Sequence, residues 1–187
     1  MDKGLLIIYS GPSGVGKGTV REEFIQDKEL NLIYSISMTT RKPRFGEKDK
    51  EDYFFVSQEE FDQAVSKKEL LEHASFVGNS YGTPKAYVEK MRNLGYNVIL
   101  EIEVEGAKQI MENSNDYLSI FLVPPSLEEL ERRIRARQSE SEEVIQKRMK
   151  KARNELEVVS DYHYAVVNTT PEAAAKRIKE IIKENID

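Results

Sequence analysis

Short apolar runs alternate along the chain with stretches of helical periodicity. Four runs have the continuous hydrophobicity of strands buried on both faces: residues 5–9, 97–102, 118–123 and 164–167. Between them, the spacing of apolar residues predicts helices at 19–27, 84–93 and 171–184, and Thr170 is the expected N-cap of the last one. This alternation predicts an α/β fold, in which a parallel sheet carries helices on both faces.

The segment 35–83 departs from this alternation. It contains short strand-like runs, at 52–56 and again at 74–77. Between these runs, Ser57 and Glu60 have the spacing of a capping box, which predicts the start of a helix. We therefore expect a small mixed α+β insertion in the parallel sheet.

Residues 126–159 form a second departure, because they are helical and highly charged. Capping-box spacing at Ser126 and Ser139 predicts two helix starts. The first helix has only one narrow apolar stripe, and such a weakly anchored helical pair is typical of a lid. We expect one compact chain with a core made of 1–34, 84–125 and 160–187, the insertion at 35–83 and the lid at 126–159.

The most informative polar segment follows the first strand. Residues 11–19, called the phosphate loop below, have the pattern of a phosphate-binding loop between a strand and a helix. Backbone N–H groups and the positive end of the helix bind phosphates in such loops, and Lys17 reaches the outer phosphates of a nucleoside triphosphate. The alternative is a glycine-rich turn with an incidental lysine. The expected phosphate-binding residues are Gly11, Pro12, Ser13, Gly14, Val15, Gly16, Lys17, Gly18 and Thr19.

The phosphate loop differs from the general pattern directly after its lysine. A Ser or Thr usually ligates Mg²⁺ there, but this chain has Gly18, and its hydroxyl comes one residue later at Thr19. We therefore expect Mg²⁺ to be held through the nucleotide phosphates and water, with Glu101 or Glu103 as candidate carboxylates. Residues two apart in a strand point the same way, here at the carboxyl end of the sheet. The alternative is a strand end that turns toward water.

Composition narrows the class of protein. With 187 residues the chain can bury one substantial core, and no apolar run approaches the ~20 residues of a membrane span. We expect no signal peptide, and the absence of cysteine excludes disulfides and thiolate metal sites. The net charge of −5 argues against a polymeric nucleic acid as the partner. The composition fits the reducing environment of the cytoplasm, where we expect the protein, and the net charge does not argue against a mononucleotide as ligand.

A second phosphate site is predicted within residues 37–47. This segment is rich in hydroxyl groups and arginines, and Tyr53 follows it in a predicted strand. Arginine guanidinium groups match phosphate oxygens in geometry, and a tyrosine hydroxyl adds a directional donor. The alternative is a solvated basic turn.

In combination, these segments resemble the guanylate kinase family. The resemblance spans nearly the whole chain and is carried by residues 11–17, 37–47, 52–57, 81–83, 100–106, 124–126 and 147–149. It implies a P-loop enzyme of purine nucleotide metabolism that uses ATP and Mg²⁺ to phosphorylate GMP to GDP.

The resemblance also implies roles for individual residues. A carboxylate at Glu72 suits guanine, whose N1–H and N2–H₂ are adjacent donors, whereas adenine would present an acceptor. Glu103 takes a place near the guanine and the metal where the family usually has aspartate. The implied GMP-binding residues are Ser37, Arg41, Arg44, Tyr53, Glu72, Tyr81, Thr83 and Glu103. The implied catalytic residues are Lys17, Arg41, Arg137 and Arg148, with Arg133 and Arg153 as weaker candidates and Asn168 near the adenine of ATP.

Two other functions remain open at this point. Domains that resemble guanylate kinase also serve as non-catalytic modules that bind phosphorylated peptides, although these usually lack an intact phosphate loop. A related kinase could act on another small phosphate acceptor. ATP binding tests the first alternative, and GMP use by a Glu72→Gln variant tests the second.

Overall fold

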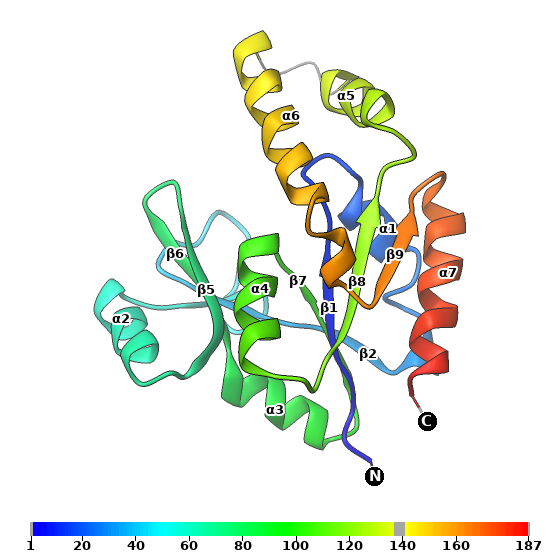
Figure 1. The fold of residues 1–187 in the computed structure, drawn as a ribbon. Helices are drawn as coiled ribbons and strands as arrows, with labels where there is room; N and C mark the ends of the chain where they lie inside the picture. The colour runs from blue at the N-terminus through cyan, green and yellow to red at the C-terminus, as the bar shows by residue number, and fades with distance from the viewer. Residues whose placement is uncertain (1, 137–140, 187) are drawn as a thin grey trace.

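The computed structural model describes residues 2–136 and 141–186. Within these residues the centre of the molecule is a five-stranded sheet with the order β2-β7-β1-β8-β9 (Figure 1). All of its neighbouring strands are parallel, which confirms the predicted α/β class. The strands are β1 (Leu6–Ser10), β2 (Leu32–Tyr34), β7 (Asn97–Glu101), β8 (Leu118–Val123) and β9 (Tyr164–Val167).

Helices cover both faces of this sheet because side chains alternate along its buried strands. Ile7 and Tyr9 of β1 belong to a hydrophobic cluster that also holds residues of α1 (Lys17–Glu22) and α7 (Pro171–Glu184). Leu6 and Ile8 belong to the cluster on the opposite face, with residues of α3 (Lys85–Asn93) and α4 (Val104–Asn113). The period of two in an extended chain thus divides one apolar run between two cores.

The helix predictions differ in how well they match. Helix α7 has the predicted bounds, and the Thr170 hydroxyl accepts a hydrogen bond from the Ala173 N–H at 3.2 Å. Helix α1 begins at Lys17 and ends at Glu22, so the predicted range of 19–27 was wrong at both ends. Gly16 has a left-handed backbone (φ 98°) that ends the loop and lets the helix start at once. The short 3₁₀ helix η1 (Lys28–Leu30) follows.

The predicted mixed insertion forms a second sheet in the described residues, with the order β4-β3-β6-β5. Its strands are β3 (Ser37–Thr39), β4 (Tyr53–Phe55), β5 (Leu70–Phe76) and β6 (Asn79–Pro84). The β3–β4 pair is parallel and the others are antiparallel. Helix α2 (Gln58–Ser66) starts at the predicted capping box, where Ser57 and Glu60 exchange side chain to backbone hydrogen bonds of 3.1 and 2.7 Å.

Two charged helices, α5 (Leu127–Ala136) and α6 (Glu142–Leu156), lie beyond the carboxyl ends of β1 and β8 (Figure 1). The N-cap of α6 is Ser141, and the predicted start at Ser139 lies outside the described residues. The 3₁₀ helix η2 (Val159–Asp161) leads from α6 to β9. No helix in residues 2–136 and 141–186 has the length and hydrophobicity that crossing a membrane requires.

Candidate functional site

The phosphate loop connects the carboxyl end of β1 with the first turn of α1. Gly14 and Gly16 both have left-handed φ angles, 87° and 98°, which residues with a Cβ rarely adopt. A Cβ at Gly14 would also lie 2.7 Å from Cγ1 of Ile134 on α5. Glycine is therefore required here by the turn and by the close approach of helix α5.

Lys17, the predicted ligand of the outer phosphates, folds its side chain back onto this loop. Its ammonium group donates to the backbone oxygens of Gly11 at 2.6 Å and Pro12 at 3.4 Å. Burial lowers the pKa of Lys17, and the nearby carboxylates of Glu101, Glu155 and Glu103 act in the opposite direction. The lysine is thus held at the phosphate loop by acceptors that a phosphate group can replace.

Other elements hold the outer side of the loop. Asn168, after β9, is 3% exposed and donates through its side-chain amide to the Val15 carbonyl at 2.7 Å. Arg133 of α5 donates to the same carbonyl at 3.3 Å and to the Asn168 carbonyl at 3.1 Å. Asn168 was predicted near adenine, and its observed side-chain contact is with the loop backbone. These two residues fix the shape of the loop.

A cavity of about 380 Å³ opens beside the phosphate loop. Carboxylates from three elements line it: Glu101 at the end of β7, Glu103 before α4, and Glu155 on α6. Glu103 is not part of the strand, contrary to our expectation, because it is the N-cap of α4. The two glutamates nevertheless reach the same cavity. Arg21 forms an ion pair with Glu101.

The oxygen donors around this cavity suit Mg²⁺. The cation prefers carboxylate, hydroxyl and water oxygens, and it is commonly bound by one or two carboxylates together with substrate phosphates. Glu101, Glu103 and Thr19 line the cavity. Among the described residues, no three His, Cys, Asp or Glu side chains are arranged so that they could hold a metal ion by themselves. Gly18 has no side chain that could ligate the metal, and no atom lies within 4 Å of where its Cβ would be. The donor set therefore fits a metal carried mainly by nucleotide phosphates.

The predicted acceptor site gathers around Arg41, in the loop after β3. Its guanidinium forms a bidentate pair with Glu47 at 2.8 and 3.0 Å, and its Cζ lies 5.2 Å from the centre of the Tyr53 ring. Glu47 and Tyr81 raise the pKa of Arg41, with Glu47 the stronger influence. The Tyr53 and Tyr81 rings are 6.4 Å apart. Three of the four predicted phosphate ligands are thus brought together.

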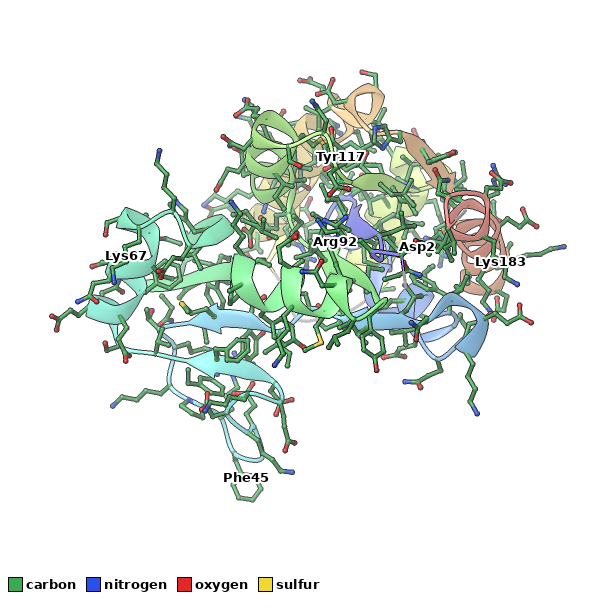
Figure 2. The ribbon with its side chains drawn as sticks, turned by 90° about the horizontal axis from the view of Figure 1, so that it is seen from below. Asp2, Phe45, Lys67, Arg92, Tyr117 and Lys183 are labelled. Carbon is green, nitrogen blue, oxygen red and sulfur yellow. The ribbon has the colours of Figure 1, made fainter. Side chains whose placement is uncertain are left out.

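Arg44, the fourth predicted phosphate ligand, lies in the projecting part of this loop. Its backbone N–H donates to Glu47 Oε2 at 2.7 Å, so the same carboxylate that pairs with Arg41 also holds this part of the loop. The next residue, Phe45, is fully exposed and projects away from the molecule (Figure 2). Glu47 therefore orients the Arg41 guanidinium and holds the Arg44 backbone, a role that the sequence analysis did not assign to it.

The predicted base-reading pair lies in the antiparallel hairpin of β5 and β6. Thr83 donates through its hydroxyl to Glu72 Oε1 at 2.6 Å, and Glu72 is only 8% exposed. Burial raises the pKa of Glu72, and the Thr83 hydrogen bond opposes this shift. Ser37 lies on β3, which pairs with β6 next to this hairpin. A buried carboxylate with one donor in place is suited to accept further hydrogen bonds from a ligand.

The first turn of α4 connects the two predicted binding sites. Glu103, its N-cap, lines the phosphate-loop cavity. Gly106, one turn later, approaches Glu72 so closely that a Cβ there would lie 2.7 Å from Oε2. Three residues of helix span only about 4.5 Å, so the two sites meet at this turn.

The predicted lid arginines are described only in part. Arg148 of α6 donates from Nη2 to the Ser13 hydroxyl of the phosphate loop at 2.9 Å. Arg137 lies outside the described residues. Arg153 is exposed on α6. Arg148 is therefore already at the phosphate loop.

The chain is similar to known proteins along nearly its whole length. The family model described as guanylate kinase matches residues 3–185. A guanylate kinase of Mesoplasma florum is 54% identical over 181 residues, which are 97% of this chain and 61% of that protein. One from Streptococcus thermophilus is 50% identical over 182 residues, 97% of this chain and 87% of the relative.

A solved structure agrees with the sequence relatives. The crystal structure of guanylate kinase from Anaplasma phagocytophilum has a TM-score of 0.72 and 34% sequence identity, covering 99% of this chain and 87% of that one. The present chain spans 61% of the length of the Mesoplasma florum and Mycoplasma capricolum relatives. The aligned region includes 97% of the present chain and leaves the rest of each relative without a counterpart here.

Proposed function

Because this chain belongs to the guanylate kinase family, we propose that it transfers the γ-phosphoryl group of ATP to the phosphate of GMP, giving ADP and GDP. The main support is the first turn of α4, where Glu103 lines the phosphate-loop cavity and Gly106 packs against Glu72. A donor-phosphate site and a base-binding site that meet at one helical turn can hold the two nucleotides next to each other. The reaction belongs to purine nucleotide metabolism, and a cytoplasmic location stays a prediction.

The phosphate loop holds the donor nucleotide. Its backbone N–H groups and the N-terminus of α1 attract the phosphates, and Lys17 exchanges the Gly11 and Pro12 carbonyls for outer phosphate oxygens. Bound Mg²⁺, for which Glu101 and Glu103 are the candidate carboxylates, supplies further neutralisation of the phosphate charge. Asn168 and Arg133 keep the loop in the required shape.

The acceptor phosphate binds between Arg41, Arg44, Tyr53 and Tyr81. Glu47 orients the Arg41 guanidinium through a bidentate pair, so that its direction is fixed before GMP arrives. The acceptor is already an anion, and the reaction needs no strong base. Positioning and charge neutralisation provide most of the rate acceleration.

The lid contributes positive charge between the two phosphates. Arg148 moves from the Ser13 hydroxyl to a phosphate oxygen when the triphosphate is bound, and Arg137 is the second candidate. Closure of α5 and α6 also excludes water, which would otherwise compete with GMP for the phosphoryl group.

Base selectivity depends on Glu72. With Thr83 already donating to Oε1, the carboxylate retains acceptor capacity for the adjacent N1–H and N2–H₂ of guanine. Adenine would leave a buried carboxylate facing an acceptor, which costs more than a poor fit of shape.

Steady-state kinetics with each nucleoside monophosphate tests this function. We expect GMP to be used far better than AMP, CMP or UMP, with ATP as donor and Mg²⁺ present. Comparable turnover of AMP or UMP would contradict the guanine assignment. Unchanged GMP use by the Glu72→Gln variant would favour a kinase with another acceptor, and absence of ATP binding in calorimetry would favour a non-catalytic module.

A further inference from the structure

Glu155 is a carboxylate at the phosphate loop that the reaction described above does not use. It lies on α6 and lines the same cavity as Lys17 and Glu103. Its side chain is 10% exposed, and its Oε2 atom is enclosed and has no hydrogen-bond partner among the described residues. Burying a carboxylate oxygen without a hydrogen bond costs folding free energy, which suggests that Glu155 has a functional role.

The neighbouring ammonium groups make no short ion pair with Glu155. Its Oε1 lies 3.7 Å from the Lys151 ammonium, but Lys151 is bonded more closely, at 2.8 Å, to Glu103. The third carboxylate of the cavity, Glu101, is paired with Arg21. Around the cavity, acidic groups therefore offset much of the positive charge that a phosphate site needs.

The charge state of Glu155 reflects this environment. Burial raises its pKa, and Glu103 adds to that effect. Lys151, Lys17 and the backbone N–H of Ser13 oppose it. These are the groups that would respond if a ligand changed the charge of the cavity.

A negative charge at this place affects metal-free and metal-bound nucleotides differently. It repels the bare phosphates of ATP, whereas a divalent cation on those phosphates turns the repulsion into a favourable interaction. The hydration water of such a cation is also a hydrogen-bond donor of the kind that Oε2 lacks. We propose that Glu155 is a specificity-determining residue that makes the phosphate loop prefer magnesium-bound ATP to metal-free ATP.

This proposal depends on ATP being the donor, as in the proposed function, but its test can fail separately. Isothermal titration calorimetry measures the dissociation constants of ATP with excess Mg²⁺ and with EDTA. The proteins compared are the parent chain, Glu155→Gln, Glu155→Asp and, as a control, Glu157→Gln. Glu157 is the exposed C-cap residue of α6 and does not line the cavity, so Glu157→Gln makes the same change of charge outside it.

We expect the parent chain to prefer magnesium-bound ATP and Glu155→Gln to narrow that preference by about tenfold, chiefly through tighter binding of metal-free ATP. Glu155→Asp and Glu157→Gln should retain the preference. The first variant keeps a carboxylate at position 155, and the second leaves Glu155 itself unchanged. An unchanged preference in a folded Glu155→Gln protein would overturn the proposal. So would equal effects of Glu155→Asp and Glu155→Gln, since charge would then not be the cause. A parent chain that binds neither form of ATP would overturn the proposed function as well.

Discussion

A single added methyl group at Gly106 tests the predicted connection between α4 and the base-reading carboxylate. In Gly106→Ala, the new Cβ would lie 2.7 Å from Oε2, 3.2 Å from Cδ and 3.4 Å from Cγ of Glu72. All three close atoms belong to one side chain. The backbone of α4 can therefore stay in place while the Glu72 carboxylate moves away.

The expected size of the effect follows from the contacts that would be lost. Displacing Glu72 weakens its 2.6 Å hydrogen bond from Thr83 and its bonds to guanine. A hydrogen bond to a charged group contributes about 1.5–3 kcal/mol, so the KM for GMP should rise about 10- to 100-fold. Alanine is favoured over glycine inside a helix by about 1 kcal/mol, which offsets strain and leaves the stability nearly unchanged.

Steady-state kinetics, ATP calorimetry and thermal unfolding together separate these effects. We expect a higher KM for GMP, an unchanged dissociation constant for ATP, and a melting temperature close to that of the parent chain. Lys108→Ala, a change at an exposed position of the same helix, serves as the control. A folded Gly106→Ala protein with an unchanged KM for GMP would refute the placement of guanine at Glu72.

Three further predictions follow from the same contacts. Lys17→Ala should lower kcat at least about 100-fold with little change in GMP affinity, and equal rates would remove Lys17 from the mechanism. Burial raises the pKa of Glu72, so its ionisation opposes folding above the ordinary glutamate pKa of about 4.3. Glu72→Gln should therefore raise the unfolding midpoint at pH 7 but not at pH 4, and thermal scans at both values would show it. The buried Arg92 guanidinium donates hydrogen bonds to Gly4, Glu89 and Asp116, so Arg92→Ala should lower the free energy of unfolding in denaturant by about 2–3 kcal/mol. A decrease below about 0.5 kcal/mol would contradict this.

The sequence predicted those parts of the fold that have a continuous local pattern. The strands β1, β7, β8 and β9 are apolar runs because both of their faces are buried. Strand β2 has only three residues and lies at the edge of the sheet with no buried side chain, so its pattern is short and weak. Helix α4 was missed as well, because it follows the apolar strand β7 with only two residues between them.

The predicted site shows a similar division between local and long-range information. The phosphate loop and the Ser57 capping box depend on fixed spacing within a few residues, and the sequence contains that spacing directly. Gly106 and Glu72 are separated by 34 residues in the sequence, and they come into contact only when α4 packs on β5. No spacing rule predicts such a contact.

The roles of charged residues depend on long-range contacts that a local pattern does not contain. Glu155 stands among many lysines and glutamates of α6, and its burial results from the docking of that helix beside the phosphate loop. Glu47 likewise looks like a solvated turn residue until its bidentate pair with Arg41 is seen. Glu103 was expected in a strand but occupies the N-cap position of α4, and it lines the cavity from there. A charge pattern alone does not distinguish these cases from solvated faces.

The most direct test of the whole account is a crystal structure with GMP and a non-hydrolysable ATP analogue bound together. The account predicts the triphosphate along the phosphate loop, guanine at Glu72 and Thr83, and the terminal phosphate of the donor facing the phosphate of GMP beside the first turn of α4. Two nucleotides whose phosphates face apart, or an acceptor pocket left empty at saturating GMP, would contradict it.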